Sequence, residues 1–287
     1  MSKRKPLWLV VLTVTLFTTV LAIASIRYRL DSRPVKGPLV SSRQNPIVPP
    51  TATGQANVRV AQLGPQLRWH LKVLGDRLEK PGKERLTVTG TFSRSGDAQP
   101  GTFVMIAEFP DRLRFMLQQG LQTRVITFDG QQAKALGRSL EAAERDLIET
   151  LVYDTAEHFF STRMLGQPMR FLGSRFSIDE HLSADNTGPY YDIYQIGDLI
   201  KPSPDHRQQA KVYYFNSDTL LLERVRYKIN SAGSEVLVEV LIGDWRKENT
   251  NQVARRIERI ENGKSVFVVT VGSVDLSTRL NDGIFGG

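Results

Sequence analysis

The longest hydrophobic feature of the chain is an uncharged run near its N-terminus. It covers twenty residues, 7–26. At about 1.5 Å per residue, a helix of this length spans about 30 Å, the thickness of the hydrocarbon core of a bilayer. The run therefore predicts a transmembrane helix, and we interpret the rest of the chain as tethered to a membrane or exported across it.

Helical periodicity appears twice in the body of the chain. Apolar residues at spacings of three and four predict a first helix at about 58–78 and a second helical region at 140–160. Asp154, with Glu157 three residues later, resembles a capping box. This pattern indicates two helices that meet near Tyr153.

Most of the remaining chain shows the patterns of strands. Residues 112–118 alternate, with Leu113, Phe115 and Leu117 on one face and Arg112 and Arg114 on the other. Apolar content and turn residues predict a strand that begins at 86 and further strands at 101–109, 122–128, 190–196, 211–215, 220–229, 235–245, 253–260 and 265–274. Because the spacers between consecutive strands are short, we expect an antiparallel meander.

Several of these strands are apolar on both faces. In the strand at 235–245, Val236, Val238 and Val240 lie opposite Leu237 and Leu241. An antiparallel sheet with such strands needs cover on both sides, or it lines an apolar cavity. Two or three helices cannot cover a sheet of this size completely. We therefore predict an α+β fold: a large, strongly curved antiparallel sheet (a half-barrel) with a few helices over its concave face, plus the N-terminal transmembrane helix.

The N-terminal segment has two interpretations. Ala22-Ile23-Ala24 matches the small-x-small pattern of a signal-peptide cleavage site. However, the apolar run is long for a signal peptide, and Arg27 and Arg29 follow directly, which favours an uncleaved signal anchor. Basic residues lie on both sides of the run, so the positive-inside rule hardly discriminates between the two orientations of the helix. The position of the run at the extreme N-terminus favours the N-terminus inside and the body outside.

The positive charge of the chain is concentrated near this segment. Of the net charge of +8, residues 1–56 carry +7 (eight basic, one acidic), and 57–287 carry +1 (38 − 8 = 30 basic, 30 − 1 = 29 acidic). Basic residues at a membrane surface gain about 1 kcal/mol each from anionic headgroups. The body lacks the basic excess of a nucleic-acid-binding domain. We predict a signal anchor at 1–26, a proline-rich basic linker at 27–56 that acts as a spacer, and one domain at 57–287.

The sequence offers little catalytic material. It has no cysteine, which excludes disulfides, thiolate metal sites, a Cys nucleophile and a lipid anchor on an N-terminal Cys. It has no nucleophile elbow, P-loop or zinc-protease motif. Asp154 and His158 are spaced as half a metal site would require, but we interpret them as a surface pair at a helix start. We expect no enzyme activity, no cofactor and no metal.

Aromatic residues are frequent on the predicted strands. One interpretation is an ordinary core, and the other is an apolar pocket for a lipid chain. Burying a sixteen-carbon acyl chain at ~0.8 kcal/mol per methylene gives on the order of 10 kcal/mol before entropic terms. Such a pocket needs no catalytic residues. The aromatic residues are Phe103, Phe109, Phe115, Phe128, Tyr190, Tyr191, Tyr194, Tyr213, Tyr214 and Phe215.

Residues 101–130 resemble the LolA/LolB-type lipoprotein carriers and related outer-membrane lipoprotein-sorting proteins. The resemblance rests on the strand from Gly101 to a turn at Pro110, the Arg/aromatic strand at 112–118, and the Asp129-Gly130 turn. Residues 213–220 and 242–245 also look like C-terminal strands of this family. The resemblance covers most of 57–287.

This resemblance implies a half-open, curved sheet whose helices cover an apolar concavity for acyl chains. The alternation in each strand independently places its three members on one face. The carriers often have a basic residue just before the proline, where this chain has Phe109. The residues implied to line the cavity are Phe103, Met105, Phe109, Leu113, Phe115 and Leu117.

Three functional hypotheses follow. The first is a non-enzymatic envelope protein of a bacterium, held at the inner membrane by residues 7–26 with its C-terminal domain in the periplasm, that binds lipid or lipoprotein acyl chains. The second is an RseB-like regulatory or scaffolding module that binds another envelope protein. The third is a hydrolase whose serine, histidine and acid assemble in space.

Overall fold

A computed structural model describes residues 64–75, 85–108, 112–164, 169–176, 189–197, 210–231, 233–276 and 285. The predicted signal anchor, the linker and Phe109 lie outside these residues. Within the described ranges, no helix is long and apolar enough to cross a membrane.

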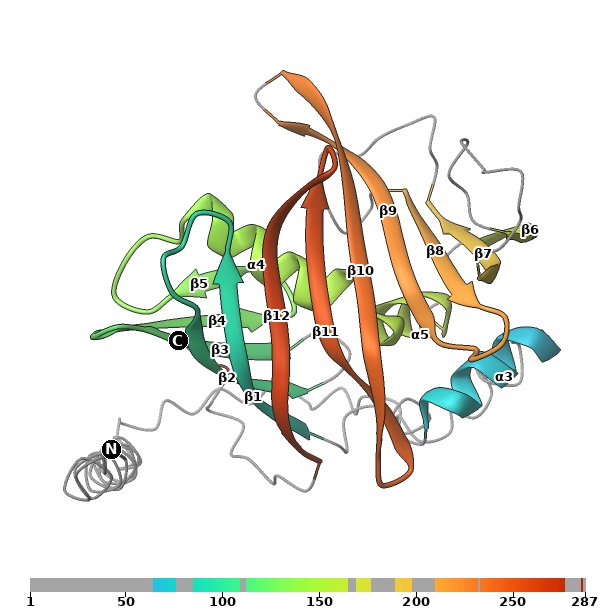
Figure 1. Ribbon diagram of the computed structural model, residues 1–287, viewed down its shortest axis with the longest axis horizontal. Coiled ribbons are helices and arrows are strands. Elements are labelled where there is room, and N and C mark those ends of the chain that lie inside the picture. Colours follow the sequence, from blue (N-terminus) through green and yellow to red (C-terminus); the bar gives the residue numbers. More distant parts are fainter. Residues whose placement is uncertain are drawn as a thin grey trace, which may run out of the picture. The chain divides into compact units, whose positions relative to one another are not determined.

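The described chain forms an α+β fold around one antiparallel twelve-stranded sheet, as predicted in outline (Figure 1). The strand order is β5-β4-β3-β2-β1-β12-β11-β10-β9-β8-β7-β6. The strands are β1 (Arg85–Arg94), β2 (Gly101–Glu108), β3 (Arg112–Gln119), β4 (Gln122–Asp129), β5 (Ala133–Ala135), β6 (Met169–Phe176), β7 (Tyr190–Ile196), β8 (Lys211–Asn216), β9 (Leu222–Ser231), β10 (Ser234–Glu248), β11 (Asn251–Glu261) and β12 (Lys264–Asp275).

The sheet consists of two meanders, β1–β5 and β6–β12, joined by antiparallel pairing of β1 with β12. The pairing register shifts between Thr89 and Gly90. A Cβ atom at Gly90 would lie 2.0 Å from the carbonyl oxygen of Thr270 and 2.9 Å from the ring of Phe103. Glycine is therefore required where the two meanders meet.

The alternation predicted for β3 is confirmed, because Leu113, Phe115 and Leu117 are all buried while Arg112 is exposed. Strands β5 and β6 were not predicted. β5 is too short to show a pattern, and the register of β6 with β7 shifts between Phe171 and Gly173. Such a shift interrupts the period of two on which strand prediction depends.

The structure describes three helices: α3 (Pro65–Leu74), α4 (Ala142–Tyr153) and α5 (Ala156–Met164). α3 falls within the predicted range, and α4 and α5 meet next to Tyr153 as predicted. The predicted capping box at their junction is wrong. The hydroxyl of Thr155 accepts the His158 N–H at 3.1 Å, and the Asp154 carboxylate has other partners.

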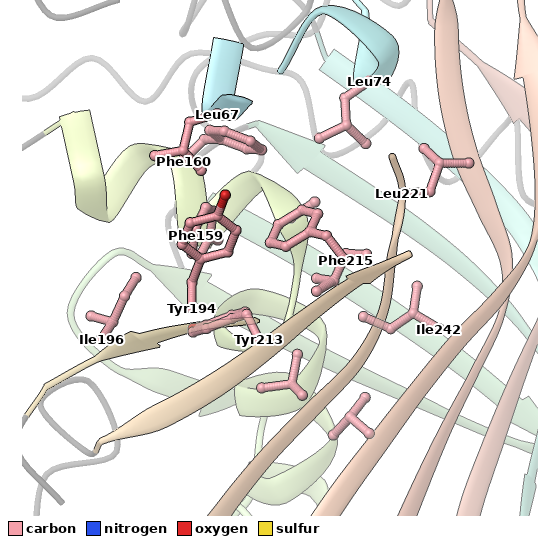
Figure 2. Packing of buried hydrophobic residues seen from close by; sticks show 14 of the residues in the cluster. Leu67, Leu74, Phe159, Phe160, Tyr194, Ile196, Tyr213, Phe215, Leu221 and Ile242 are labelled. Atoms are coloured by element: carbon pink, nitrogen blue, oxygen red, sulfur yellow. The ribbon is translucent and has the colours of Figure 1, made fainter. Parts of the chain in front are cut away.

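All three helices pack on the same side of the sheet, here called the covered face, where two hydrophobic cores lie. One core joins α3 and α5 to β7–β10, and the other joins α4 to β1–β4 and β12. In the first core, the ring of Phe159 lies 4.9 Å from those of Tyr213 and Phe215 (Figure 2). The aromatic residues of these strands are therefore largely core.

Candidate functional site

An apolar cavity lies on the covered face between the two cores; we call it the seam cavity. It offers about 70 Å³ of space to a water-sized molecule, room for about five waters. Its walls come from β1–β3, β10–β12, α4, α5 and the α4–α5 junction. The lining residues are Leu86, Val88, Met105, Ala107, Leu113, Leu151, Thr155, Ala156, Glu157, Ile242, Trp245, Val253, Ala254, Ile257, Val269 and Val271.

The lining is apolar apart from Thr155, Glu157 and the indole N–H of Trp245. That indole N–H donates to the carbonyl oxygen of Leu222 at 3.0 Å, and Glu157 is buried. An apolar cavity of this kind favours the transfer of hydrocarbon from water. It provides no cluster of groups for acid–base or nucleophilic chemistry.

Trp245 reaches the seam cavity because the backbone of β10 departs from regular strand geometry. Ile242 and Trp245 are three residues apart, so they would face opposite sides of a regular strand. Asp244 has a φ of 50°, in the left-handed region that non-glycine residues seldom adopt. This kink turns the Asp244 side chain to solvent and aligns Trp245 with Ile242 along the cavity wall.

The α4–α5 junction above the cavity is fixed by a buried ionic cluster of Asp154, Lys211, Tyr227, Arg259 and Thr150. The Asp154 carboxylate forms an ion pair with Lys211 and accepts a hydrogen bond from the Tyr227 hydroxyl at 2.8 Å. The Arg259 guanidinium donates to Thr150 at 3.0 Å and to Tyr227 at 3.3 Å. Burial and the nearby charge of Asp154 raise the pKa of Tyr227, so its hydroxyl stays neutral and can donate. Charges of both signs thus tie α4 to β8, β9 and β11.

The cluster corrects the interpretation of Asp154 and His158 as a surface pair. Asp154 is 1% exposed, and its ion-pair partner is Lys211. Burial and the nearby Lys211 charge lower the pKa of His158 to about 4, so its imidazole is neutral at pH 7. Across the described ranges, no group of three or more His, Asp or Glu residues is placed to hold a metal ion.

The six predicted cavity residues are placed differently from one another. Met105 and Leu113 line the seam cavity. Phe103, Phe115 and Leu117 belong to the core under α4, where the Phe103 and Phe115 rings stack at 5.1 Å. Phe109 lies outside the described residues. Ligand contact by any of the six stays a prediction.

Most of the cavity wall was not identified from the sequence. Ile242, Trp245, Ala254 and Ile257 come from β10 and β11, and Leu151 comes from α4. The stretch 242–245 did carry a signal, because it resembled a family strand. The period of two would have paired Ile242 with Asp244, not with Trp245.

A serine, an acid and a histidine do assemble elsewhere on the covered face, but in the wrong order for nucleophilic catalysis. The Ser174 hydroxyl donates to Asp192 at 2.6 Å, and Asp192 lies 3.4 Å from Nε2 of His70. His70 is fully buried, and its Nδ1 lies 2.9 Å from the Leu220 carbonyl oxygen. A catalytic triad requires the histidine between the serine and the acid. This arrangement instead links α3 to β7.

The sequence matches no protein-family model and no curated protein. Among solved structures, the chain is similar to a LolA superfamily protein from Nitrosomonas europaea, with a TM-score of 0.50 and 12% identity over 76% of this chain and 97% of that one. It is also similar to a domain described as an outer membrane lipoprotein-sorting protein from Vibrio parahaemolyticus, with a TM-score of 0.48 and 6% identity over 80% and 97%. A DUF1329 family protein from Desulfovibrio piger gives a TM-score of 0.47 and 11% identity over 77% and 95%.

Proposed function

We propose that this chain, which has a LolA-like fold, is a non-enzymatic envelope protein that binds lipid or lipoprotein acyl chains in the seam cavity. The observation that carries the proposal is the cavity itself, an apolar space on the covered face beneath the α4–α5 junction. In this proposal the sheet is the predicted half-barrel, and residues 7–26 hold the body at the bacterial inner membrane, facing the periplasm.

The size of the cavity determines how it would act. Each methylene occupies about as much space as a water molecule, so room for about five waters admits a short stretch of hydrocarbon. At ~0.8 kcal/mol per methylene, that stretch contributes about 4 kcal/mol. A sixteen-carbon chain requires α4 and α5 to move away from β11 and β12. The buried ionic cluster would set how readily this movement occurs.

A cavity-filling variant tests the proposal. Ala254 lines the seam cavity, and Ala254→Leu adds three carbons to a space for about five waters. We expect a fluorescent long-chain fatty acid to bind the domain 57–287 at least about tenfold more weakly, because the lost contacts exceed 1.4 kcal/mol. The control is Ala142→Leu at the exposed start of α4.

Circular dichroism would establish that both variants are folded. Wild-type affinity in Ala254→Leu would show that hydrocarbon does not occupy the seam cavity. Equally weak binding of the fatty acid by the wild type and both variants would contradict the proposed function and favour a module that binds another protein.

A further inference from the structure

A second opening adjoins the seam cavity on the other side of Trp245. Pairing between β9 and β10 ends at Arg224 and Leu241, whereas β10 continues to Glu248 beside β11. The β9–β10 slot lies next to this end of β9 and has a volume of about 500 Å³. Its lining residues are Tyr191, Thr219, Leu221, Glu223, Arg224, Leu241, Ile242, Gly243, Asp244 and Trp245.

The slot and the seam cavity share a wall, because Ile242 and Trp245 line both. Leu221, which also lines the slot, is buried in the core under α3 with Ile242 (Figure 2). The inner end of the slot is therefore apolar and adjoins the hydrocarbon site. Trp245 suits such a boundary, since its ring is apolar and its N–H is polar.

The outer end of the slot carries charge of both signs from Glu223, Arg224 and Asp244. Glu223 accepts hydrogen bonds from the Tyr191 hydroxyl at 3.1 Å and the Asn216 amide at 3.0 Å, which leaves further lone pairs on its carboxylate. Arg224 lies 3.4 Å from Glu239 through one nitrogen, and a guanidinium has five N–H donors. The carboxylate of Asp244 accepts from Arg246 through both oxygens, at 3.3 and 3.1 Å, and each oxygen keeps a second lone pair. The three groups can therefore engage a ligand while they keep their present partners.

The balance of these charges selects the ligand. The three lining charges and their ionic partners Glu239, Arg226 and Arg246 comprise three acidic and three basic groups, so the local charge is balanced. A purely anionic head would meet both carboxylates, and an uncharged head would use none of the three groups. A zwitterionic head satisfies all of them, with its phosphate toward Arg224 and its ammonium toward Glu223 and Asp244.

We propose that the β9–β10 slot is the head-group subsite of an amphiphile whose acyl chain enters the seam cavity past Ile242 and Trp245, and that the head is a zwitterionic phosphate–amine. This assignment rests on the proposed function and adds the class of lipid. Arg224 binds the phosphate, Asp244 and Glu223 bind the ammonium, and Trp245 separates the head from the chain.

The chain offers a closely matched pair of variants. Arg224 and Arg226 both project from β9, both lie 3.4 Å from the same oxygen of Glu239, and their side chains are 21% and 23% exposed. Only Arg224 lines the slot. Arg224→Gln and Arg226→Gln therefore remove the same charge and the same ion-pair partner. Arg226→Gln also removes a hydrogen bond to Tyr214, and only Arg224→Gln removes the head-group contact.

The assay uses the full chain with Trp8→Phe and Trp69→Phe, so that Trp245 is the only tryptophan. The protein is reconstituted in phosphatidylglycerol vesicles containing a small fraction of lipid with brominated chains: phosphatidylethanolamine, diacylglycerol or phosphatidylglycerol. Bromine on a chain in the seam cavity quenches Trp245. We expect phosphatidylethanolamine to quench about tenfold more effectively per molecule than diacylglycerol, the effect of one charge-assisted contact.

Arg224→Gln should reduce this preference to the level of diacylglycerol, and Arg226→Gln should retain it. Asp244→Asn, which keeps the size of the side chain and tolerates the left-handed backbone, should remove the preference for phosphatidylethanolamine over phosphatidylglycerol. Equal quenching by all three lipids, or equal losses in the two arginine variants, would overturn the head-group assignment while leaving acyl binding intact. Absence of quenching by every lipid would overturn the proposed function together with it.

Discussion

Replacing Lys211 by methionine removes the positive charge from a deeply buried ion pair on the covered face. The side chains of Lys211 and Asp154 are 4% and 1% exposed. Methionine has a similar length and fills the space beside the rings of Tyr153 and Tyr227. What changes is that the carboxylate of Asp154 stays in the interior without its cation.

Removing one partner of a buried pair destabilises a protein by about 3–5 kcal/mol, because the remaining charge is desolvated and uncompensated. For a domain of about 230 residues, this corresponds to a decrease in Tm of about 6–20 °C. Lys228 provides a control, because it lies 2.7 Å from Glu235 with both side chains more than 60% exposed. An exposed pair contributes about 0.2–1 kcal/mol, so Lys228→Met should change the Tm little.

The double variant Lys211→Met with Asp154→Asn completes the test. The amide introduced by Asp154→Asn carries no charge and can still accept the hydrogen bond of Tyr227, so the double variant should be more stable than Lys211→Met alone. Urea unfolding followed by circular dichroism at pH 7 measures the wild type and all three variants. Equal losses in Lys211→Met and Lys228→Met, or a double variant less stable than the single one, would refute the view that Asp154 is a desolvated charge.

Three further predictions concern backbone fit and pH. Gly90→Ala should lower the free energy of unfolding by about 2 kcal/mol or more, since its Cβ would lie 2.0 Å from a carbonyl oxygen. Gly243→Ala should have little effect, because a Cβ there would have no atom within 4 Å. Comparable losses for the two variants in urea unfolding would contradict this. Burial and the nearby charge of Asp146 raise the pKa of Glu149 from 4.5 to about 7. Between these values the folded state holds a proton that the unfolded state loses, so the free energy of unfolding should fall as pH rises. Glu149→Gln should show a smaller fall than the wild type between pH 4.5 and 8, and an unchanged profile would contradict the pKa shift. Burial lowers the pKa of His70 below 6.5, so the unfolded state gains the proton first and the free energy of unfolding should fall as pH drops through 6.5. We therefore expect the unfolding free energy of the wild type to decrease relative to that of His70→Gln on acidification. A constant difference between the two proteins would contradict this.

The parts of the fold that were predictable from sequence are those in which a local pattern has one structural solution. In β3, alternation with one buried face fixes which side chains point inward, so Leu113, Phe115 and Leu117 were assigned to one face correctly. The two helices around Tyr153 were also visible, because α4 carries an apolar stripe. β6 was not predicted because its pairing with β7 is irregular near Gly173.

The candidate site was less predictable because it depends on contacts between distant residues. Asp154 meets Lys211 and Tyr227 only when β8 and β9 pack beneath α4, and the sequence around Asp154 shows only a nearby His158. The inward position of Trp245 requires the positive φ of Asp244, which alternation cannot anticipate. Predictions for residues 1–56 concern a part of the chain outside the described residues, and they stay predictions.

Native mass spectrometry can detect an acyl chain held in the seam cavity. The domain 57–287 would be exported in a bacterial host and purified without detergent. We predict a stoichiometric adduct with the mass of a phospholipid or acyl chain, reduced in Ala254→Leu and retained in Ala142→Leu. A folded domain that shows only its own mass, and that takes up no added fluorescent fatty acid, would contradict acyl-chain binding in the seam cavity.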